Sequence, residues 1–462
     1  MKTVLERAVF LYMASLVSSG LINSIIFTFL KLTESRVKKV LVITYYWPPS
    51  GGAGVQRWLK FVKYLPQFGV QPIVLTVDPQ FASYAQTDES LLKDVSPDTE
   101  VFHTKSFELY QFYSRLSKKK EIPYGGFANE TKPSLFQKLS RFVRGNFLLP
   151  DPRKGWNKYA YRKALKIINA HHIDTVITTG PPHSTHLTGL KLKKRTDVRW
   201  IADLRDPWTD IYYYKQFYHT ALARRIDRRM ERQVVENADH LITVSKDVMR
   251  LFNQKTTNDI SRKTTILPNG FDETDFAQDA VAFDEKFTIT YTGTISDAYD
   301  ISSFIEALKQ LEEDEIDQLR IRFVGKVPSV ITNRIKTTLP NLVMELTGYV
   351  DHQKSVEYLL SSSMLLLVIP KVENNAGILT GKFFEYMASG KSILAIGPTD
   401  GDLAEIIRET NCGQIFGYGE SSGIGSFIMD NLRNGLKPKT RNTDHYSRRG
   451  LTEQLSKILI PG

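Results

Sequence analysis

A helix opened by a glycine lies between two short apolar runs in the last third of the chain, and no other pattern constrains the fold as strongly. The apolar runs cover residues 364–369 and 392–397, and residues 381–391 between them read GKFFEYMASGK. Two buried strands joined through a helix predict a doubly wound, parallel α/β sheet. Ligands of such sheets bind beyond the carboxyl ends of the strands, where a helix amino-terminus favours anionic groups.

Lys382 and Glu385 lie in the first turns of this predicted helix. A lysine ammonium can bind phosphate, and a carboxylate can accept hydrogen bonds from two hydroxyl groups. These are the groups that a nucleoside-diphosphate sugar requires. The alternative is an ordinary surface ion pair at the start of a helix.

Length and composition set outer limits on the function. At 462 residues the chain is too long for one compact core, so two domains plus additions are expected. The single cysteine, Cys412, excludes an internal disulfide and a thiolate metal cluster, and it fits a reducing, cytoplasmic setting. The formal charge of +11 indicates anionic partners such as a phospholipid surface or a phosphorylated substrate. No Walker loop, zinc-finger spacing or RNA-binding signature occurs, so no nucleic-acid partner is expected.

An uncharged run at residues 8–30 is long enough to span a bilayer as a helix. It also contains several polar residues and lacks a cleavage pattern. Residues 1–37 are therefore expected to be a membrane anchor, an amphipathic addition or an extension of the gene start. The basic residues that follow the run favour a cytoplasmic location for the next domain.

A glycine-rich turn follows an apolar run near the start of the predicted globular part. Residues 47–54 read WPPSGGAG, and Gly52 and Gly54 let backbone amides approach a ligand closely. Alone, such a turn is weak evidence for a ligand site. It lacks the lysine and hydroxyl residue of a Walker loop.

Two polar loops follow later predicted strands, GPPHSTH at residues 180–186 and DLRDPW at residues 203–208. Such loops lie at the edge where an open α/β sheet places its site. His183 and His186 could act as general bases or bind phosphate, while Asp203, Arg205 and Asp206 could bind a sugar or an acceptor. The alternative is that the carboxylates cap the next helix and pair with Arg205, and that the histidines satisfy local backbone groups.

Together these segments resemble family 4 of the glycosyltransferases, which are retaining enzymes of the GT-B fold. GKFFEYMASGK is similar to the donor-site helix of that family, and WPPSGGAG is similar to the first loop of its amino-terminal domain. The two polar loops resemble those of bacterial surface-polysaccharide transferases. Residues 268–272, PNGFD, resemble the exit from the first domain, and residues 447–459 resemble a terminal helix that crosses back to it.

The resemblance implies two Rossmann-like domains that face each other across a cleft, with a C-terminal helix returning to the first domain. The expected divisions are an apolar segment at 1–37, an acceptor-side domain at 38–270, a nucleotide-sugar domain at 271–440 and the crossover helix at 441–462. The implied activity is transfer of a sugar from a nucleoside-diphosphate sugar to a saccharide acceptor, expected to be lipid-linked, in cell-surface polysaccharide synthesis. Such an enzyme would work in the cytoplasm at the inner face of the cell membrane.

The same resemblance assigns roles to residues. The donor diphosphate is expected near Gly293, Lys382 and the start of the helix, with ribose hydroxyls at Glu385. Gly52 and Gly54 would contact the donor from the other side of the cleft. Catalysis is expected to depend on Lys382, Asp203, Arg205 and His183.

The sequence departs from the family pattern in two places. Gly377 stands where many members have the first of two glutamates, of which Glu385 matches the second. No cation follows the opening strand of the second domain, so Lys326 and Lys371 are expected to help neutralise the phosphates. Two other functions therefore stay open: a nucleotide-sugar epimerase of the same fold, and a non-catalytic membrane-associated scaffold without nucleotide affinity.

Asp400 and Asp402 have the Asp-x-Asp form that binds a divalent ion in the other large glycosyltransferase fold. Here the pair precedes a predicted helix at residues 403–408, so Asp402 is expected to cap that helix. The GT-B resemblance implies that a helix dipole and basic side chains stabilise the leaving diphosphate. Neither a metal nor a cofactor is therefore expected.

Residues 134–149 carry apolar and basic side chains at helical spacing. This pattern predicts a basic amphipathic helix that lies on anionic lipid and guides the acceptor to the cleft. The alternative is a helix packed on the core with a solvated basic face. The apolar set is Leu135, Leu139, Phe142 and Val143, and the basic set is Lys138, Arg141 and Arg144.

Overall fold

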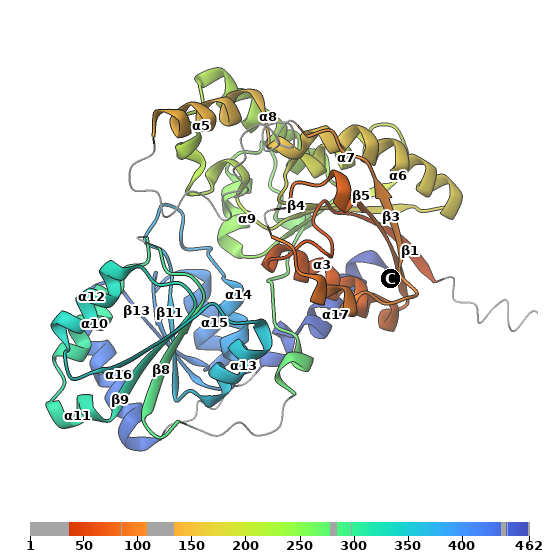
Figure 1. Ribbon diagram of the computed structural model, residues 1–462. Helices are drawn as coiled ribbons and strands as arrows, with labels where there is room; N and C mark the ends of the chain where they lie inside the picture. Colours follow the sequence, from red (N-terminus) through yellow and green to blue (C-terminus); the bar gives the residue numbers. More distant parts are fainter. Residues whose placement is uncertain are drawn as a thin grey trace, which may run out of the picture.

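The computed structural model describes residues 37–84, 86–108, 134–277, 284–296, 298–435, 440 and 442–460. Two parallel sheets, each covered by helices on both faces, form two domains (Figure 1). The two doubly wound domains expected from the sequence are thus confirmed. The expected anchor at residues 8–30 lies outside the described residues. Within the described parts, no helix is long and apolar enough to cross a membrane.

The first domain contains a seven-stranded sheet with the order β3-β2-β1-β4-β5-β6-β7, and every neighbouring pair is parallel. Its strands are β1 (Lys38–Ile43), β2 (Val70–Val77), β3 (Glu100–Thr104), β4 (Thr175–Gly180), β5 (Arg199–Leu204), β6 (His240–Thr243) and β7 (Thr264–Ile266). Its α-helices are α3 (Ala53–Tyr64), α5 (Leu135–Phe147), α6 (Asn157–His171), α7 (Ser184–Lys193), α8 (Ala221–Asn237) and α9 (Lys246–Asn253).

The second domain contains a six-stranded parallel sheet with the order β10-β9-β8-β11-β12-β13. Its strands are β8 (Phe287–Thr292), β9 (Leu319–Val324), β10 (Val343–Gly348), β11 (Met364–Val368), β12 (Ser392–Ile396) and β13 (Gly413–Phe416). Its helices are α10 (Ser302–Lys309), α11 (Glu313–Asp317), α12 (Ser329–Thr338), α13 (His352–Ser361), α14 (Gly381–Ala388), α15 (Asp402–Thr410) and α16 (Ser421–Asn434).

Strand β11 illustrates why the central strands are apolar throughout. Successive side chains of a strand point to opposite faces of the sheet. Leu365 and Leu367 pack with α13, α14 and α15, while Met364, Leu366 and Val368 pack with α10 and α16 on the other face. Because both faces are covered by helices, every residue of the strand is buried.

The last helix, α17 (Arg448–Leu459), leaves the second domain and packs beside α3 of the first domain (Figure 1). Leu451, Leu455 and Leu459 are fully or almost fully buried in the same core cluster as Trp58 of α3. The predicted crossover of the C-terminal helix is therefore confirmed.

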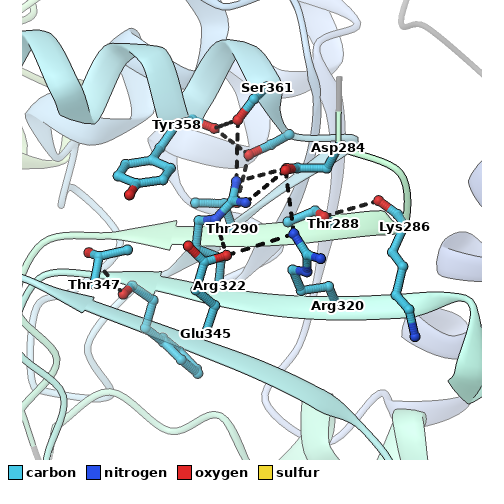
Figure 2. Close-up of polar contacts among 12 residues, drawn as sticks. Asp284, Lys286, Thr288, Thr290, Arg320, Arg322, Glu345, Thr347, Tyr358 and Ser361 are labelled. Carbon is cyan, nitrogen blue, oxygen red and sulfur yellow. Dashed lines mark hydrogen bonds and ion pairs between the residues drawn. The ribbon is translucent and has the colours of Figure 1, made fainter. Parts of the chain in front are cut away.

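A buried ionic cluster fixes the start of the second domain to its sheet. Arg322 on β9 is 3% exposed and binds Asp284 through two hydrogen bonds of 2.8 and 2.9 Å. Its third nitrogen donates to Glu345 on β10 at 2.8 Å, and the guanidinium lies 4.9 Å from the Tyr358 ring centroid (Figure 2). A buried charge needs partners of this kind. Arg322 and Arg320 pair with both acids inside this cluster, which we interpret as structural.

Both sheets change direction at one point, between β1 and β4 in the first domain and between β8 and β11 in the second. Open α/β sheets bind ligands at this point, beyond the carboxyl ends of the strands. The loop after β1 holds Gly52 and leads into α3, whose first turn contains Gly54, and the loop after β4 holds His183. The loop after β8 holds Gly293, and the loop after β11 leads into α14.

Candidate functional site

In the second domain, the sheet edge brings Lys382 and Gly293 together. Lys382 Nζ donates a hydrogen bond of 2.7 Å to the Tyr291 hydroxyl and lies 4.3 Å from the centroid of that ring. Gly293 has a φ of +96°, and a Cβ at this position would lie 3.1 Å from Lys382 Nζ. Glycine therefore serves two needs here, the left-handed backbone and the space for the ammonium.

The start of α14 offers unpaired donors beside this ammonium. No side chain caps the helix, and no acidic residue lies in its first turn. The Thr380 hydroxyl, at the N-cap position, is buried and has no hydrogen-bond partner within the described part of the chain. Nothing lies within 4 Å of a Cβ built on Gly381. A helix amino-terminus with free amides, a free hydroxyl and an adjacent lysine is a favourable site for a phosphate group.

Burial lowers the pKa of Lys382 to about 8, although Glu385 one turn later acts against this shift. Burial also raises the pKa of Glu385, which faces the charges of His352, Asp275 and Arg448. Among the described residues, none donates a hydrogen bond to the Glu385 carboxylate. Its acceptor capacity is therefore available for a ligand.

The two other predicted phosphate-binding lysines do not join this group. Lys371 is largely exposed, lies 3.6 Å from the Asp300 carboxylate and stands over the Tyr418 ring. Lys326 is exposed, and its backbone carbonyl accepts a hydrogen bond from Ile295 at 3.0 Å. Neither contacts Lys382 within the described ranges.

In the first domain, Arg205 binds the two loops at the switch point together. Its Nη1 donates to the Gly54 carbonyl at 2.6 Å, and its Nε donates to the Gly180 carbonyl at 2.9 Å. Gly52 has a φ of +96° and starts α3 without a side-chain cap. A Cβ on Gly54 would lie 3.1 Å from Arg205 Nη1. Gly54 and Arg205 are therefore in contact beside Gly52, but among the described residues none of the three contacts Lys382.

Asp203 is fully buried and does not reach the interdomain space. Its carboxylate accepts hydrogen bonds from Arg57 at 3.1 and 3.4 Å, from Trp58 Nε1 at 2.6 Å and from the Thr179 hydroxyl at 2.8 Å. Burial acts to raise the pKa of Asp203, but the charge of Arg57 and these hydrogen bonds lower it overall. The predicted contact of Asp203 with a sugar has no support in this geometry, because every acceptor position is inside the domain.

His183 and His186 lie in a pocket of aromatic rings. The His183 ring stacks on Trp208 at 4.6 Å, and His186 Nδ1 lies 2.9 Å from the Thr178 hydroxyl. Burial lowers the pKa of His183 well below its usual value and that of His186 to about 3. Both imidazoles are therefore neutral near pH 7 and weak as bases.

A cavity of about 470 Å³ lies between the domains, next to Arg205. Residues 373, 374 and 377–379 of the second domain form one side of it. Arg144 of α5 and Arg153 line it from the first domain, together with the start of α3 and Asp206. Burial and the neighbouring Arg153 lower the pKa of Arg144, and burial raises the pKa of Asp206. Two arginines that repel each other in one cavity favour an anionic ligand.

Sequence reasoning missed Arg144 and Arg153 as cavity residues. They come from segments far from the glycine-rich turn, and no motif marks them. Arg144 was predicted to face lipid, but it lies over the Phe217 ring at 4.4 Å and points into the domain. Arg141 is 5% exposed, so it does not face lipid either. This part of the prediction is wrong, because the arginine side of α5 packs inward.

Gly377 and Asp402 lie where the domains touch. A Cβ on Gly377 would lie 2.8 Å from the Ser245 hydroxyl and 2.9 Å from Asp247 Cβ in the first domain. Asp402 accepts hydrogen bonds from the backbone amides of Lys246 and Asp247, both at 2.9 Å. The prediction that Asp402 caps its own helix is therefore wrong, since it caps α9 of the other domain.

Two family models match consecutive parts of the chain. Glycosyltransferase Family 4 matches residues 123–275, and Glycosyl transferases group 1 matches residues 272–443. Among curated protein sequences, none matches this chain.

Solved structures share the fold at low sequence identity. Sucrose-phosphate synthase from Thermosynechococcus elongatus aligns with a TM-score of 0.58 at 14% identity, over 91% of this chain and 98% of that chain. A glycosyltransferase from Rickettsia africae aligns with a TM-score of 0.52 at 14% identity, over 92% and 99%. The apo form of the lipopolysaccharide outer core galactosyltransferase WaaB aligns with a TM-score of 0.53 at 11% identity, over 91% and 98%.

Proposed function

The chain is a glycosyltransferase of family 4 with the GT-B fold, and we propose that it transfers a sugar from a nucleoside-diphosphate sugar to a lipid-linked saccharide. The configuration at the anomeric carbon is retained. The bond between this carbon and the diphosphate breaks, a bond to an acceptor hydroxyl oxygen forms, and the hydroxyl proton is released. The reaction belongs to cell-surface polysaccharide synthesis at the inner face of the cell membrane.

The arrangement around Lys382 is the observation that carries the proposal. Negative charge grows on the departing diphosphate in the transition state, and preorganised donors aimed at this charge lower the barrier. Lys382, the unpaired Thr380 hydroxyl and the uncapped start of α14 are such donors. Glu385, one turn later, accepts hydrogen bonds from the ribose hydroxyls. No metal is needed in this proposal, so activity is expected to persist in a chelator.

The acceptor side is the cavity between the domains. Arg144, Arg153 and the start of α3 would bind an anionic group there, which fits the diphosphate of a lipid-linked saccharide. Asp206 lines the same cavity and is available to accept a hydrogen bond from the acceptor hydroxyl. Water excluded by closure of the cavity would suppress hydrolysis of the donor.

A screen of nucleotide sugars by thermal shift, followed by calorimetric titration, tests the donor. A ligand at about 100 times its dissociation constant adds roughly 2.7 kcal/mol to the free energy of unfolding. Incubation with the selected donor alone separates the alternatives. An isomerised sugar would indicate an epimerase, and the absence of affinity for any nucleotide sugar would indicate a scaffold.

Two variants then test the site. Lys382→Ala removes a charge-assisted hydrogen bond worth about 1.5 to 3 kcal/mol, and more in the transition state, so turnover should fall more than donor affinity. Glu385→Ala should instead weaken the binding of the nucleotide sugar and the free nucleotide together. Lys336→Ala on the exposed side of α12 is the matched control. Wild-type affinity and turnover in both site variants would contradict the assignment.

A further inference from the structure

Helix α5 turns its apolar side to solvent and its arginine side to the protein, the opposite of a helix that packs on a core. Leu135, Leu139 and Phe147 are 84%, 60% and 67% exposed, and Phe142 and Val143 are exposed as well. The arginine side faces inward, where Gly145 allows the helix to approach the Phe217 carbonyl closely. An apolar helix face turned to solvent indicates an interaction surface.

Helix α8 lies beside α5 at the same end of the first domain (Figure 1). Asn146 of α5 joins the two helices, because its side chain accepts from the Thr220 amide at 2.8 Å and donates to the Tyr218 carbonyl at 3.1 Å. Thr220 in turn caps α8. The two helices therefore present one continuous surface.

The charges of α8 are sorted by sign between its two sides. Asp227 and Glu231 are buried on the inner side. Asp227 accepts hydrogen bonds from Trp208 and Tyr214, both at 2.9 Å, and Glu231 binds Thr209 and Lys255. The outer side of the first three turns carries arginines beside two exposed apolar residues. These are Arg224, Arg225, Arg228 and Arg229, with Leu222 and Ile226.

From this arrangement we propose that the α5–α8 surface docks on an anionic lipid surface. We define it by its apolar residues Leu135, Leu139, Phe142, Val143, Phe147, Leu222 and Ile226 and by its basic residues Lys138, Arg224, Arg225, Arg228 and Arg229. The apolar side chains enter the boundary between headgroups and acyl chains, and the basic side chains bind lipid phosphates. Arg144 leads from the inner side of α5 to the cavity between the domains, so a lipid-linked acceptor would reach that cavity directly from the membrane.

This proposal extends the proposed function, and it rests on that function only for the identity of the acceptor. Vesicle binding is measured without donor or acceptor, however, so each proposal can fail while the other holds. The test uses the full chain. Because residues 8–30 could also bind a membrane, vesicle binding alone does not show which surface makes the contact, and a label must locate it.

The location is tested with a label at position 139. Cys412 is fully buried, so a fluorophore reacts selectively with the cysteine introduced by Leu139→Cys. With vesicles of phosphatidylcholine and roughly one third phosphatidylglycerol, the label should shift to the blue and be quenched by nitroxide-labelled lipid. A label introduced by Tyr349→Cys, at a 77% exposed site of the second domain, should show neither effect.

The charge requirement is tested by changing Arg224, Arg225, Arg228 and Arg229 to glutamine. The vesicle partition coefficient should fall by up to about 600-fold, since each of the four basic residues near an anionic surface contributes roughly fivefold. Changing Lys309, Lys336, Lys354 and Lys457 to glutamine removes the same formal charge from exposed sites elsewhere and should have a much smaller effect.

Four results would overturn the proposal. The full chain could fail to bind the vesicles, or bind them while the label at position 139 stays in water. The label could already be shielded from water without lipid. Shielding that is independent of protein concentration would indicate that residues 109–133 cover the surface, and shielding that increases with concentration would indicate that a second copy covers it. Finally, both sets of glutamine variants could reduce binding equally.

Discussion

Asp402 in the second domain accepts a hydrogen bond of 2.9 Å from the backbone amide of Asp247 in the first domain. It also accepts from the Lys246 amide, so one carboxylate satisfies two free donors at the start of α9. Asp402→Ala should cost about 0.5 to 2 kcal/mol of this domain contact, the usual range for a lost helix cap. We expect a lower Tm and a larger radius of gyration in solution scattering. Asp400→Ala, at an exposed neighbour, should change neither quantity, and equal behaviour of the two variants would contradict the role of Asp402.

Gly377 permits the same domain contact from the other side of the interface. Because its Cβ would collide with Ser245 and Asp247, Gly377→Ala should hold the domains apart, at a cost of about 1 to 3 kcal/mol that is typical of overpacking. Turnover should fall, while nucleotide affinity at Lys382 should change little. Gly419→Ala is the matched control, since nothing lies within 4 Å of its Cβ. A Gly377→Ala variant with the turnover of the control would show that the contact does not serve catalysis.

The fold could be predicted from local sequence patterns. The apolar runs that form β11 and β12 and the glycine that opens α14 suffice to predict a parallel α/β sheet. The pairing of Gly293 with Lys382 was predictable for the same reason, since strand ends of one parallel sheet meet at one edge.

The orientation of α5 could not be predicted in this way. Helical spacing showed which side chains share a face, but the direction of that face depends on Gly145 fitting against Phe217, more than 70 positions along the chain. The capping role of Asp402 was hidden for the same reason. An aspartate at the start of a helix normally caps that helix, and only the tertiary structure shows that the free amides of α9 lie closer.

The first-domain aspartates Asp203 and Asp206 differ in burial, and this difference predicts opposite phenotypes. Asp203→Ala would leave the Arg57 guanidinium buried without its carboxylate partner, which typically costs about 3 to 5 kcal/mol, so the Tm should fall strongly. Asp206 lines the cavity and has a pKa raised by burial, so its charge does not stabilise the fold. Asp206→Asn should keep or raise the Tm while lowering turnover. Thermal melts and donor turnover are measured on both variants. An Asp203→Ala variant as stable as the wild type would contradict the structural role of Asp203.

Lys382 should make donor binding depend on pH in the alkaline range. Because burial lowers its pKa to about 8, the free protein loses this charge as the pH rises through that value, and affinity for a nucleoside diphosphate should fall. The free energy of unfolding should change in the opposite direction. Above pH 8 the unfolded chain, whose lysine has the ordinary higher pKa, binds more protons than the folded chain, so this residue makes stability rise with pH until the unfolded lysine also titrates.

Calorimetric titration at a series of pH values measures the affinity, and denaturant unfolding at the same values measures the stability. Lys382→Met should show weak binding without this pH dependence, because the titrating group is gone. Lys371→Met, at a largely exposed lysine of the neighbouring loop, should keep the wild-type fall in affinity. If the wild-type affinity were constant through pH 8 and above, Lys382 would not carry the charge that meets the diphosphate, and the donor site would have to be sought elsewhere in the cleft.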